Sequence, residues 1–174
     1  TVDAGSTSDE MVNDGSDTYV AWLWKANGGS TSSNSDGSIT STVQANTTAG
    51  FSIVTYTGNV TAGATVGHGL GAIPKMIIVK SRDNATPWVV YHSGNTSAPE
   101  TEYLRLNETS ATADFTTWND TAPTSSVFSL GTTTWVNATS SMLAYCFAEV
   151  EGYSKFGKYT GNGNAGGAFV YTGF

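Results

Sequence analysis

The residues best suited to acid–base chemistry in this chain are its two histidines, His68 and His92. Neither belongs to a His-Glu-x-x-His motif, no Gly-x-Ser-x-Gly motif occurs, and Cys146 has no histidine near it in the sequence. His68 lies in the glycine-rich residues 67–71, a pattern typical of a turn. We therefore expect a histidine that bonds backbone groups, no catalytic residues, and a protein that is not an enzyme.

A glycosidase is the enzymatic alternative, because that reaction needs two carboxylates facing each other about 5–10 Å apart across a cleft. The available carboxylates stand in no recognisable motif. They are Glu100, Glu102, Asp114 and Asp120.

Acidic residues crowd the first eighteen positions, and residues 13–17 have the oxygen-rich, glycine-turned pattern of a calcium loop. Asp14 and Asp17 are the candidate ligands. The segment lacks the full spacing and the terminal glutamate of an EF-hand, and a solvated acidic arm explains the same residues. We expect no cofactor, with calcium as the one ion that the sequence leaves open.

Aromatic rings beside amides and carboxylates are the usual means of binding sugars, because rings stack on the sugar's C–H faces while polar groups read its hydroxyls. Trp118, followed by Asn119 and Asp120, lies in a polar stretch between expected strands. It is therefore the first candidate for an exposed sugar-binding indole, and Trp135 is the second. Packing in the core or between subunits explains the same tryptophans.

Composition excludes several classes of partner. Charged residues make up 12% of the chain and the net charge is −7. No basic stripe exists to neutralise phosphates, so we expect no nucleic-acid partner. No apolar run approaches the roughly 20 residues that span a bilayer, so we expect no membrane insertion. The single cysteine allows no intrachain disulfide, and its apolar neighbours predict a buried structural thiol.

Short β-branched and aromatic runs separated by Gly, Asn and Asp predict strands, and no segment has a sustained helical spacing of apolar residues. Residues 75–82 and 88–92 are predicted to form a hairpin. Many short strands favour an all-β fold, an antiparallel β-sandwich or jelly roll of lectin-like type, preceded by an extended N-terminal arm. The other predicted strands cover residues 19–25, 38–43, 102–106, 126–130, 142–148, 154–160 and 168–172.

The chain also repeats itself, which is typical of an array of one structural unit. Three segments have counterparts more than a hundred residues further along: 19–24 matches 142–147, 51–59 matches 153–162, and 65–70 matches 169–174. We therefore predict an acidic arm over residues 1–18, then an incoming strand and a Ser/Gly/Asn-rich loop over residues 19–50. Residues 51–174 form the jelly-roll unit and end in the first strands of a truncated repeat.

Half-units at both ends suit strand exchange, in which a segment of one copy completes the sheet of another. The aromatic residues of these ends are the expected contacts between copies. They are Tyr19, Trp22, Trp24, Phe169, Tyr171 and Phe174.

Four stretches of this sequence, residues 65–80, 88–92, 122–131 and 144–157, resemble a domain common in virion proteins of tailed phages, notably marine ones. The resemblance covers most of residues 19–174. It implies a tail-fibre or other virion-surface protein with a jelly-roll or lectin-like sandwich, and it brings no catalytic residues.

These observations favour a non-enzymatic structural protein of the virion surface, or another extracellular location, that acts in assembly and host attachment. Its expected partners are further copies of itself, other virion proteins, and a host-surface glycan. One alternative is a lectin-like carbohydrate-binding module. A second is the repeat subunit of an extracellular filament joined by strand exchange.

Overall fold

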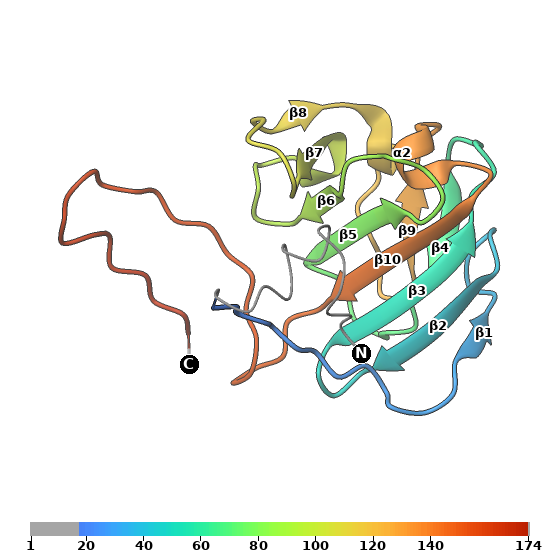
Figure 1. The fold of residues 1–174 in the computed structure, drawn as a ribbon, viewed down its shortest axis with the longest axis horizontal. Coiled ribbons are helices and arrows are strands. Elements are labelled where there is room, and N and C mark those ends of the chain that lie inside the picture. Colours follow the sequence, from blue (N-terminus) through green and yellow to red (C-terminus); the bar gives the residue numbers. More distant parts are fainter. Residues whose placement is uncertain (1–17, 174) are drawn as a thin grey trace.

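The computed structural model describes residues 18–173, and within them the chain is almost entirely β-structure (Figure 1). Ten strands alternate with short loops, one four-residue helix and two 3-10 turns. The strands are β1 (Ser32–Asn34), β2 (Ser41–Asn46), β3 (Phe51–Thr57), β4 (Ala64–Gly67), β5 (Met76–Ser81), β6 (Val89–His92), β7 (Glu102–Arg105), β8 (Ala113–Asp114), β9 (Val127–Leu130) and β10 (Ser141–Phe147). The helical pieces are η1 (Pro99–Thr101), η2 (Thr116–Trp118) and α2 (Thr134–Asn137).

Eight of the strands form one antiparallel sheet in the order β1-β2-β3-β10-β5-β6-β7-β8. The remaining two, β4 and β9, pair with each other and lie behind the large sheet (Figure 1). A parallel bridge between Ile39 and Val66 connects the start of the first layer to the second. The prediction of an all-β antiparallel sandwich is confirmed, and the jelly-roll topology within it stays a prediction.

The longest ladder joins β3 to β10 in the middle of the large sheet, with Phe51 opposite Phe147 at one end and Thr57 opposite Ser141 at the other. Side chains alternate between the two faces of a strand. Val54 and Ala144 therefore point into the space between the layers, where both are fully buried. The core between the layers is closed by side chains from β4, β5 and β9, among them Val66, Ile77, Val79, Phe128 and Leu130.

The opposite face of the same strands carries a second apolar cluster. The tilted rings of Phe51 and Phe147 lie in it with centroids 4.9 Å apart, and the ring of Tyr145 stacks on Phe51 at 6.4 Å. The partly buried side chains of Ile53 and Met76 pack against it. The large sheet is therefore apolar on both faces near its centre.

A buried amide holds the turn after β3 against the ends of β9 and α2. Asn137 is fully buried, and its Nδ2 donates to the carbonyls of Thr61 (3.1 Å) and Gly131 (2.7 Å). Its Oδ1 accepts the backbone N–H of Asn59 at 2.8 Å, and its backbone carbonyl accepts from Val60 at 3.0 Å. Loop backbone left inside a sandwich needs partners of this kind, because no strand ladder reaches it.

Several expected elements are confirmed. Strands β5 and β6 form the predicted antiparallel hairpin, and β7, β9 and β10 lie within one residue or so of their predicted bounds. Cys146 is buried, as its neighbours in the sequence predict. No helix among residues 18–173 is long and apolar enough to cross a bilayer.

Other expectations need correction. Within the described residues, 19–25 and 168–172 contain no strand, and 154–160 contains only the bridge from Ser154 to Val150. The reason is topological. Residues 19–25 and 154–160 resemble β10 and β3, which already pair with each other, and residues 168–172 resemble β4, which already pairs with β9. The loop predicted before β3, in which one short strand was expected over residues 38–43, contains two strands, β1 and β2, which extend the large sheet.

Replacing the buried amide tests how much the fold depends on it. We expect Asn137→Ala to lower the free energy of unfolding by roughly 2 kcal/mol, because it removes three hydrogen bonds and leaves the buried carbonyl of Gly131 without this partner. Urea denaturation followed by tryptophan fluorescence measures this loss. Asn164→Ala, in an exposed turn, is the control, and an equal effect of both substitutions would contradict this role for Asn137.

Candidate functional site

The first predicted sugar-binding residue, Trp118, is a core residue. Its side chain is 2% exposed, its Nε1 donates to the carbonyl of Glu102 at 2.9 Å, and its ring meets Tyr91 edge-on at 5.9 Å. The prediction of an exposed indole here is wrong. The turn η2 directs the ring inward, and the chain leaves it through Asn119 and Asp120, which both have positive φ.

The second predicted indole, Trp135, lies half-buried on α2 in an aromatic cluster at the surface. Its ring centroid is 5.5 Å from that of Tyr103 and 6.2 Å from that of Phe115, which is 48% exposed. The guanidinium carbon of Arg105 lies 5.0 Å from the ring centroid of Trp135 and 5.4 Å from that of Tyr103. This arrangement offers a rim of ring surface next to a fixed positive charge.

Arg105 is held in place by polar partners as well as by the rings. Its Nη1 is 2.6 Å from the carboxylate of Glu108, and its Nη2 donates to the hydroxyl of Tyr103 at 3.1 Å. The hydrogen bond to Glu108 is the main cause that raises the pKa of Arg105, and the same bond lowers the pKa of Glu108. The pair is the only ion pair in the described part of the chain, and it borders an open hollow of about 620 Å³ lined by residues 106–110.

Neither Arg105 nor Phe115 was expected from the sequence. The alternation in Glu-Tyr-Leu-Arg, residues 102–105, places Tyr103 and Arg105 on one face of β7. The backbone bond from Phe115 to Thr101 brings the third ring to the neighbouring position. The alternation that places Tyr103 and Arg105 on one face could be seen in the sequence. The approach of Phe115 to these side chains could not, because it depends on a contact between distant segments.

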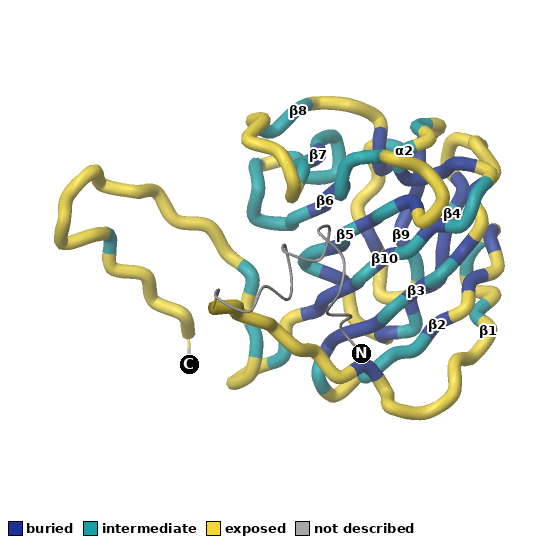
Figure 2. The backbone as a smooth tube through the Cα atoms, viewed as in Figure 1, coloured by how far each residue is buried: buried dark blue, intermediate teal, exposed yellow. Residues whose placement is uncertain are grey.

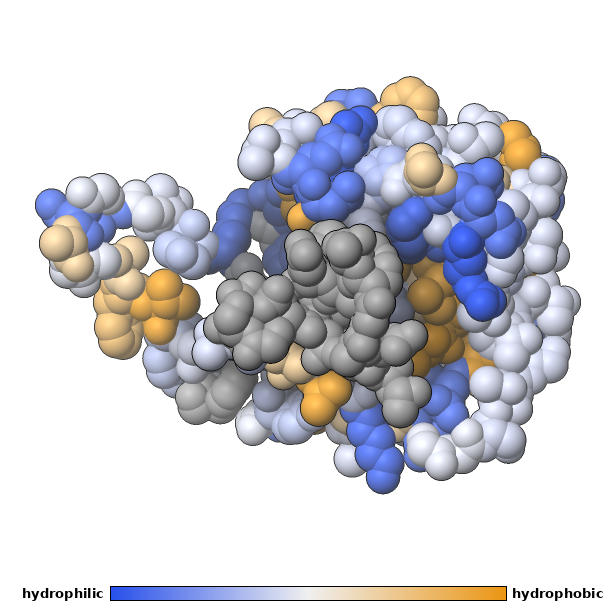
Figure 3. Space-filling view, in the orientation of Figure 1, coloured by the Kyte–Doolittle hydropathy of each residue, from blue (hydrophilic) through white to orange (hydrophobic). Residues whose placement is uncertain are grey.

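The two terminal segments form the other candidate site. The exposed fractions are 76% for Trp22, 91% for Leu23, 93% for Phe169 and 77% for Tyr171. Figure 2 shows both segments almost entirely in the colour of exposed residues, and Figure 3 shows apolar surface on the projecting C-terminal tail. Phe174, a further predicted contact, lies outside the described residues.

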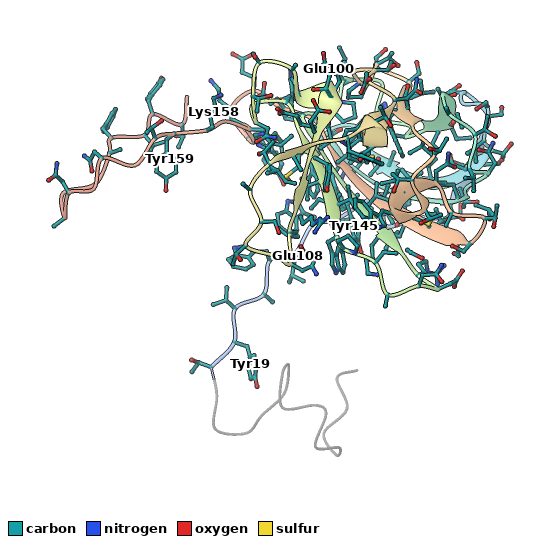
Figure 4. The ribbon with its side chains drawn as sticks, turned by 90° about the horizontal axis from the view of Figure 1, so that it is seen from above. Tyr19, Glu100, Glu108, Tyr145, Lys158 and Tyr159 are labelled. Atoms are coloured by element: carbon teal, nitrogen blue, oxygen red, sulfur yellow. The ribbon has the colours of Figure 1, made fainter. Side chains whose placement is uncertain are left out.

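Both segments start from the same place on the body. Trp24 meets Phe147 edge-on at 5.7 Å, and Phe156 lies 6.0 Å from the same ring. From there they part: Figure 4 shows Tyr19 and Tyr159 on arms that run in different directions. The C-terminal arm doubles back through a turn in which Asn162 Nδ2 donates to the carbonyl of Gly167 at 2.6 Å.

The histidines occupy structural positions. His68 is fully buried, its Nε2 lies 3.2 Å from the carbonyl of Thr124, and its Nδ1 accepts the backbone N–H of Leu70 at 3.2 Å. Burial lowers the pKa of His68, although the Thr124 carbonyl and the charge of Asp36 act in the opposite direction. His92 is half-buried beside Phe156, and burial lowers its pKa too.

The carboxylates named for a glycosidase show one close pair. Glu102 on β7 and Asp114 on β8 are directly opposite each other in the ladder, so their side chains share a face. Asp114 is exposed, and the carboxylate of Glu102 accepts a hydrogen bond from the hydroxyl of Thr96. The absence of an enzymatic activity stays a prediction.

The proposed calcium ligands, Asp14 and Asp17, lie outside the described residues. Among residues 18–173, no group of three or more His, Cys, Asp or Glu side chains comes together in a way that could hold a metal ion.

Comparison with known families gives one match. The model of a family described as a domain of unknown function, DUF7483, matches residues 1–174, so the chain belongs to that family. No curated protein and no solved structure matches this sequence.

The buried histidine predicts a pH dependence of stability. The folded state keeps His68 neutral to a lower pH than the unfolded chain, whose histidines take up a proton near pH 6.5. The unfolded state therefore binds more protons below that pH, and stability falls by up to about 1.4 kcal/mol per pH unit as the pH drops from 6.5 towards 5.5. Urea midpoints measured between pH 7.5 and 5.5 would show this fall.

Two variants show which histidine causes this pH dependence of stability. We expect His68→Asn to flatten the pH dependence while lowering stability at pH 7.5, because Asn keeps an acceptor for Leu70 and loses the bond to Thr124. His92→Asn should flatten it less, since His92 is only half-buried. A pH slope unchanged in His68→Asn would contradict the assignment.

Proposed function

We propose that this member of the DUF7483 family is a non-enzymatic structural protein of a surface assembly, of the kind found on the exterior of tailed-phage virions. It acts in assembly and in host attachment. The observation that carries the proposal is that both ends of the described chain project from a closed sandwich and present large apolar side chains to water.

Exposed aromatic residues at this density favour contact with another protein surface. Burying one large apolar side chain contributes about 1.5–3 kcal/mol. Trp22, Leu23, Phe169 and Tyr171 could together offset much of the entropy lost when two molecules associate. The body gives them little to pack on, because its core and its outer apolar cluster are formed by other residues.

The rest of the surface also suits an exterior structural role. It is polar through hydroxyls and amides, with one ion pair in the described residues and few titratable side chains in contact. The resemblance to virion-surface proteins supports the same role, and a location on the virion surface is part of this proposal.

Self-association is the direct test. We expect the 174-residue protein to form dimers or larger species with increasing concentration, measured by light scattering after gel filtration and by negative-stain microscopy. The double variant Trp22→Ser/Tyr171→Ser should weaken association roughly tenfold or more, since each lost apolar contact removes at least 1 kcal/mol.

Ile73→Ser is the matched control, because Ile73 is an exposed apolar residue on a loop of the body. It should leave association unchanged. A wild-type protein that stays monomeric over the whole concentration range, or an equal loss in both variants, would count against the proposal.

Carbohydrate binding is the second candidate function, favoured by the half-exposed rings of Trp135 and Phe115 beside Arg105. Flat ring faces stack on sugar rings, and the charge of Arg105 would suit a sugar that carries a carboxylate or sulfate. This surface lies on the body and includes no residue of the terminal segments, so both functions are compatible in a receptor-binding fibre.

A glycan array probed with the wild-type protein tests the second function. We expect binding to be lost in Phe115→Ser, which removes an exposed ring, and retained in Ile73→Ser, which changes an exposed apolar residue outside both the ring cluster and the hollow beside it. Circular dichroism and a urea midpoint establish that both variants are folded. An array without any bound glycan would exclude this function for the sugars it carries.

A further inference from the structure

The terminal segments repeat the two strands that pair in the middle of the large sheet. Residues 19–24 have the pattern of residues 142–147 in β10, with Ala21 in the place of Ala144. Residues 159–162, Tyr-Thr-Gly-Asn, are identical to residues 56–59 at the end of β3. The structure therefore gives the register in which two such segments fit: Met142 opposite Tyr56, Leu143 opposite Thr55, and Ala144 opposite Val54.

Neither segment uses this pairing within its own chain. Residues 18–31 and 155–173 contain no ladder in the described structure, and the arms that carry Tyr19 and Tyr159 run apart (Figure 4). The body cannot accept these segments in the middle of its sheet. There β3 is already paired with β2 and β10, and β10 is already paired with β3 and β5. Each segment thus has a sequence suited to a ladder and forms none within residues 18–173, although residues 155–159 face residues 170–172 across a shared hollow.

We propose that residues 19–22 of one copy pair antiparallel with residues 156–159 of a second copy, in the register of β10 on β3. This inference rests on the proposed assembly function and specifies its contact. Tyr19 then lies opposite Tyr159, Val20 opposite Lys158, and Ala21 opposite Gly157.

The side chains agree with this register. Tyr19 and Ala21 share one face with Tyr159 and Gly157, so the two rings lie side by side and two small residues meet next to them. On the other face, Val20 covers the aliphatic stem of Lys158, and Trp22 lies opposite Phe156. A shift of one residue would place every one of these side chains on the wrong face.

The anchoring of the arms allows the exchange. Trp24 and Phe156 both contact Phe147, so both arms leave the body at one position. Two copies that face each other there can exchange arms reciprocally, giving a twofold contact in which the same pairing forms twice. The ladder would add main-chain hydrogen bonds to the aromatic contacts.

Cysteine cross-linking between two differently tagged chains tests the register. One chain carries Ala21→Cys or Val20→Cys, and the other carries Gly157→Cys or Lys158→Cys. A Cβ added at Gly157 meets no atom within 4 Å, and the side chains of the other three positions are exposed, so the substitutions fit. The native Cys146 should not form cross-links, because it is buried and burial raises the pKa of its thiol to about 12.

Four mixtures are oxidised mildly, and heterodimers are measured on non-reducing gels. The in-register mixtures, 21 with 157 and 20 with 158, should cross-link roughly tenfold faster than the mixtures 21 with 158 and 20 with 157, whose side chains point to opposite faces. Equal rates in all four mixtures would overturn the proposed register.

Three further outcomes separate this inference from the function on which it rests. If no heterodimer forms while light scattering still shows association, the pairing is wrong and the assembly function stands. If a single chain with both Ala21→Cys and Gly157→Cys closes an internal disulfide as a monomer, the two arms pair within one chain and the exchange is overturned. If the protein never associates, both the inference and the assembly function fall.

Discussion

The ladder between β3 and β10 is the constraint on which the rest of the molecule depends. Seven residues of each strand are paired, and both faces of the ladder are covered, one by the core and the other by the cluster around Phe51 and Phe147. Because side chains alternate, fixing this one register decides which residues of β2 and β5 point inward. The two-stranded layer of β4 and β9 then closes over the inner face, so the sandwich is a large sheet with a small lid rather than two equal halves.

The same ladder explains the unusual ends of the chain. A sequence that repeats a central strand has a strong preference for a partner, yet the body has no vacant central position to offer it. The arms therefore carry side chains typical of a core, such as Trp22 and Tyr159, on the outside of the described structure. Local sequence preference and the available tertiary contacts disagree in these arms, and such disagreement is expected at functional sites.

The sequence was informative wherever the signal was local. The hairpin of β5 and β6 follows from two β-branched runs and a turn, and the burial of Cys146 follows from its apolar neighbours. Contacts between distant segments were not predictable in this way. Trp118 has polar neighbours in the sequence, which predict exposure. In the structure its indole bonds the carbonyl of Glu102 and packs against the ring of Tyr91. Asn137 likewise looks like any loop asparagine, and its three side-chain bonds depend on where β9 and the turn after β3 meet.

One feature, the near absence of ion pairs, bears on the setting in which such a molecule can work. The described chain is held mainly by apolar packing and by backbone hydrogen bonds, with Arg105 and Glu108 as its single ion pair. Dissolved salt weakens attraction between exposed charges and leaves neutral contacts largely untouched. We therefore expect the folded architecture to depend little on ionic strength.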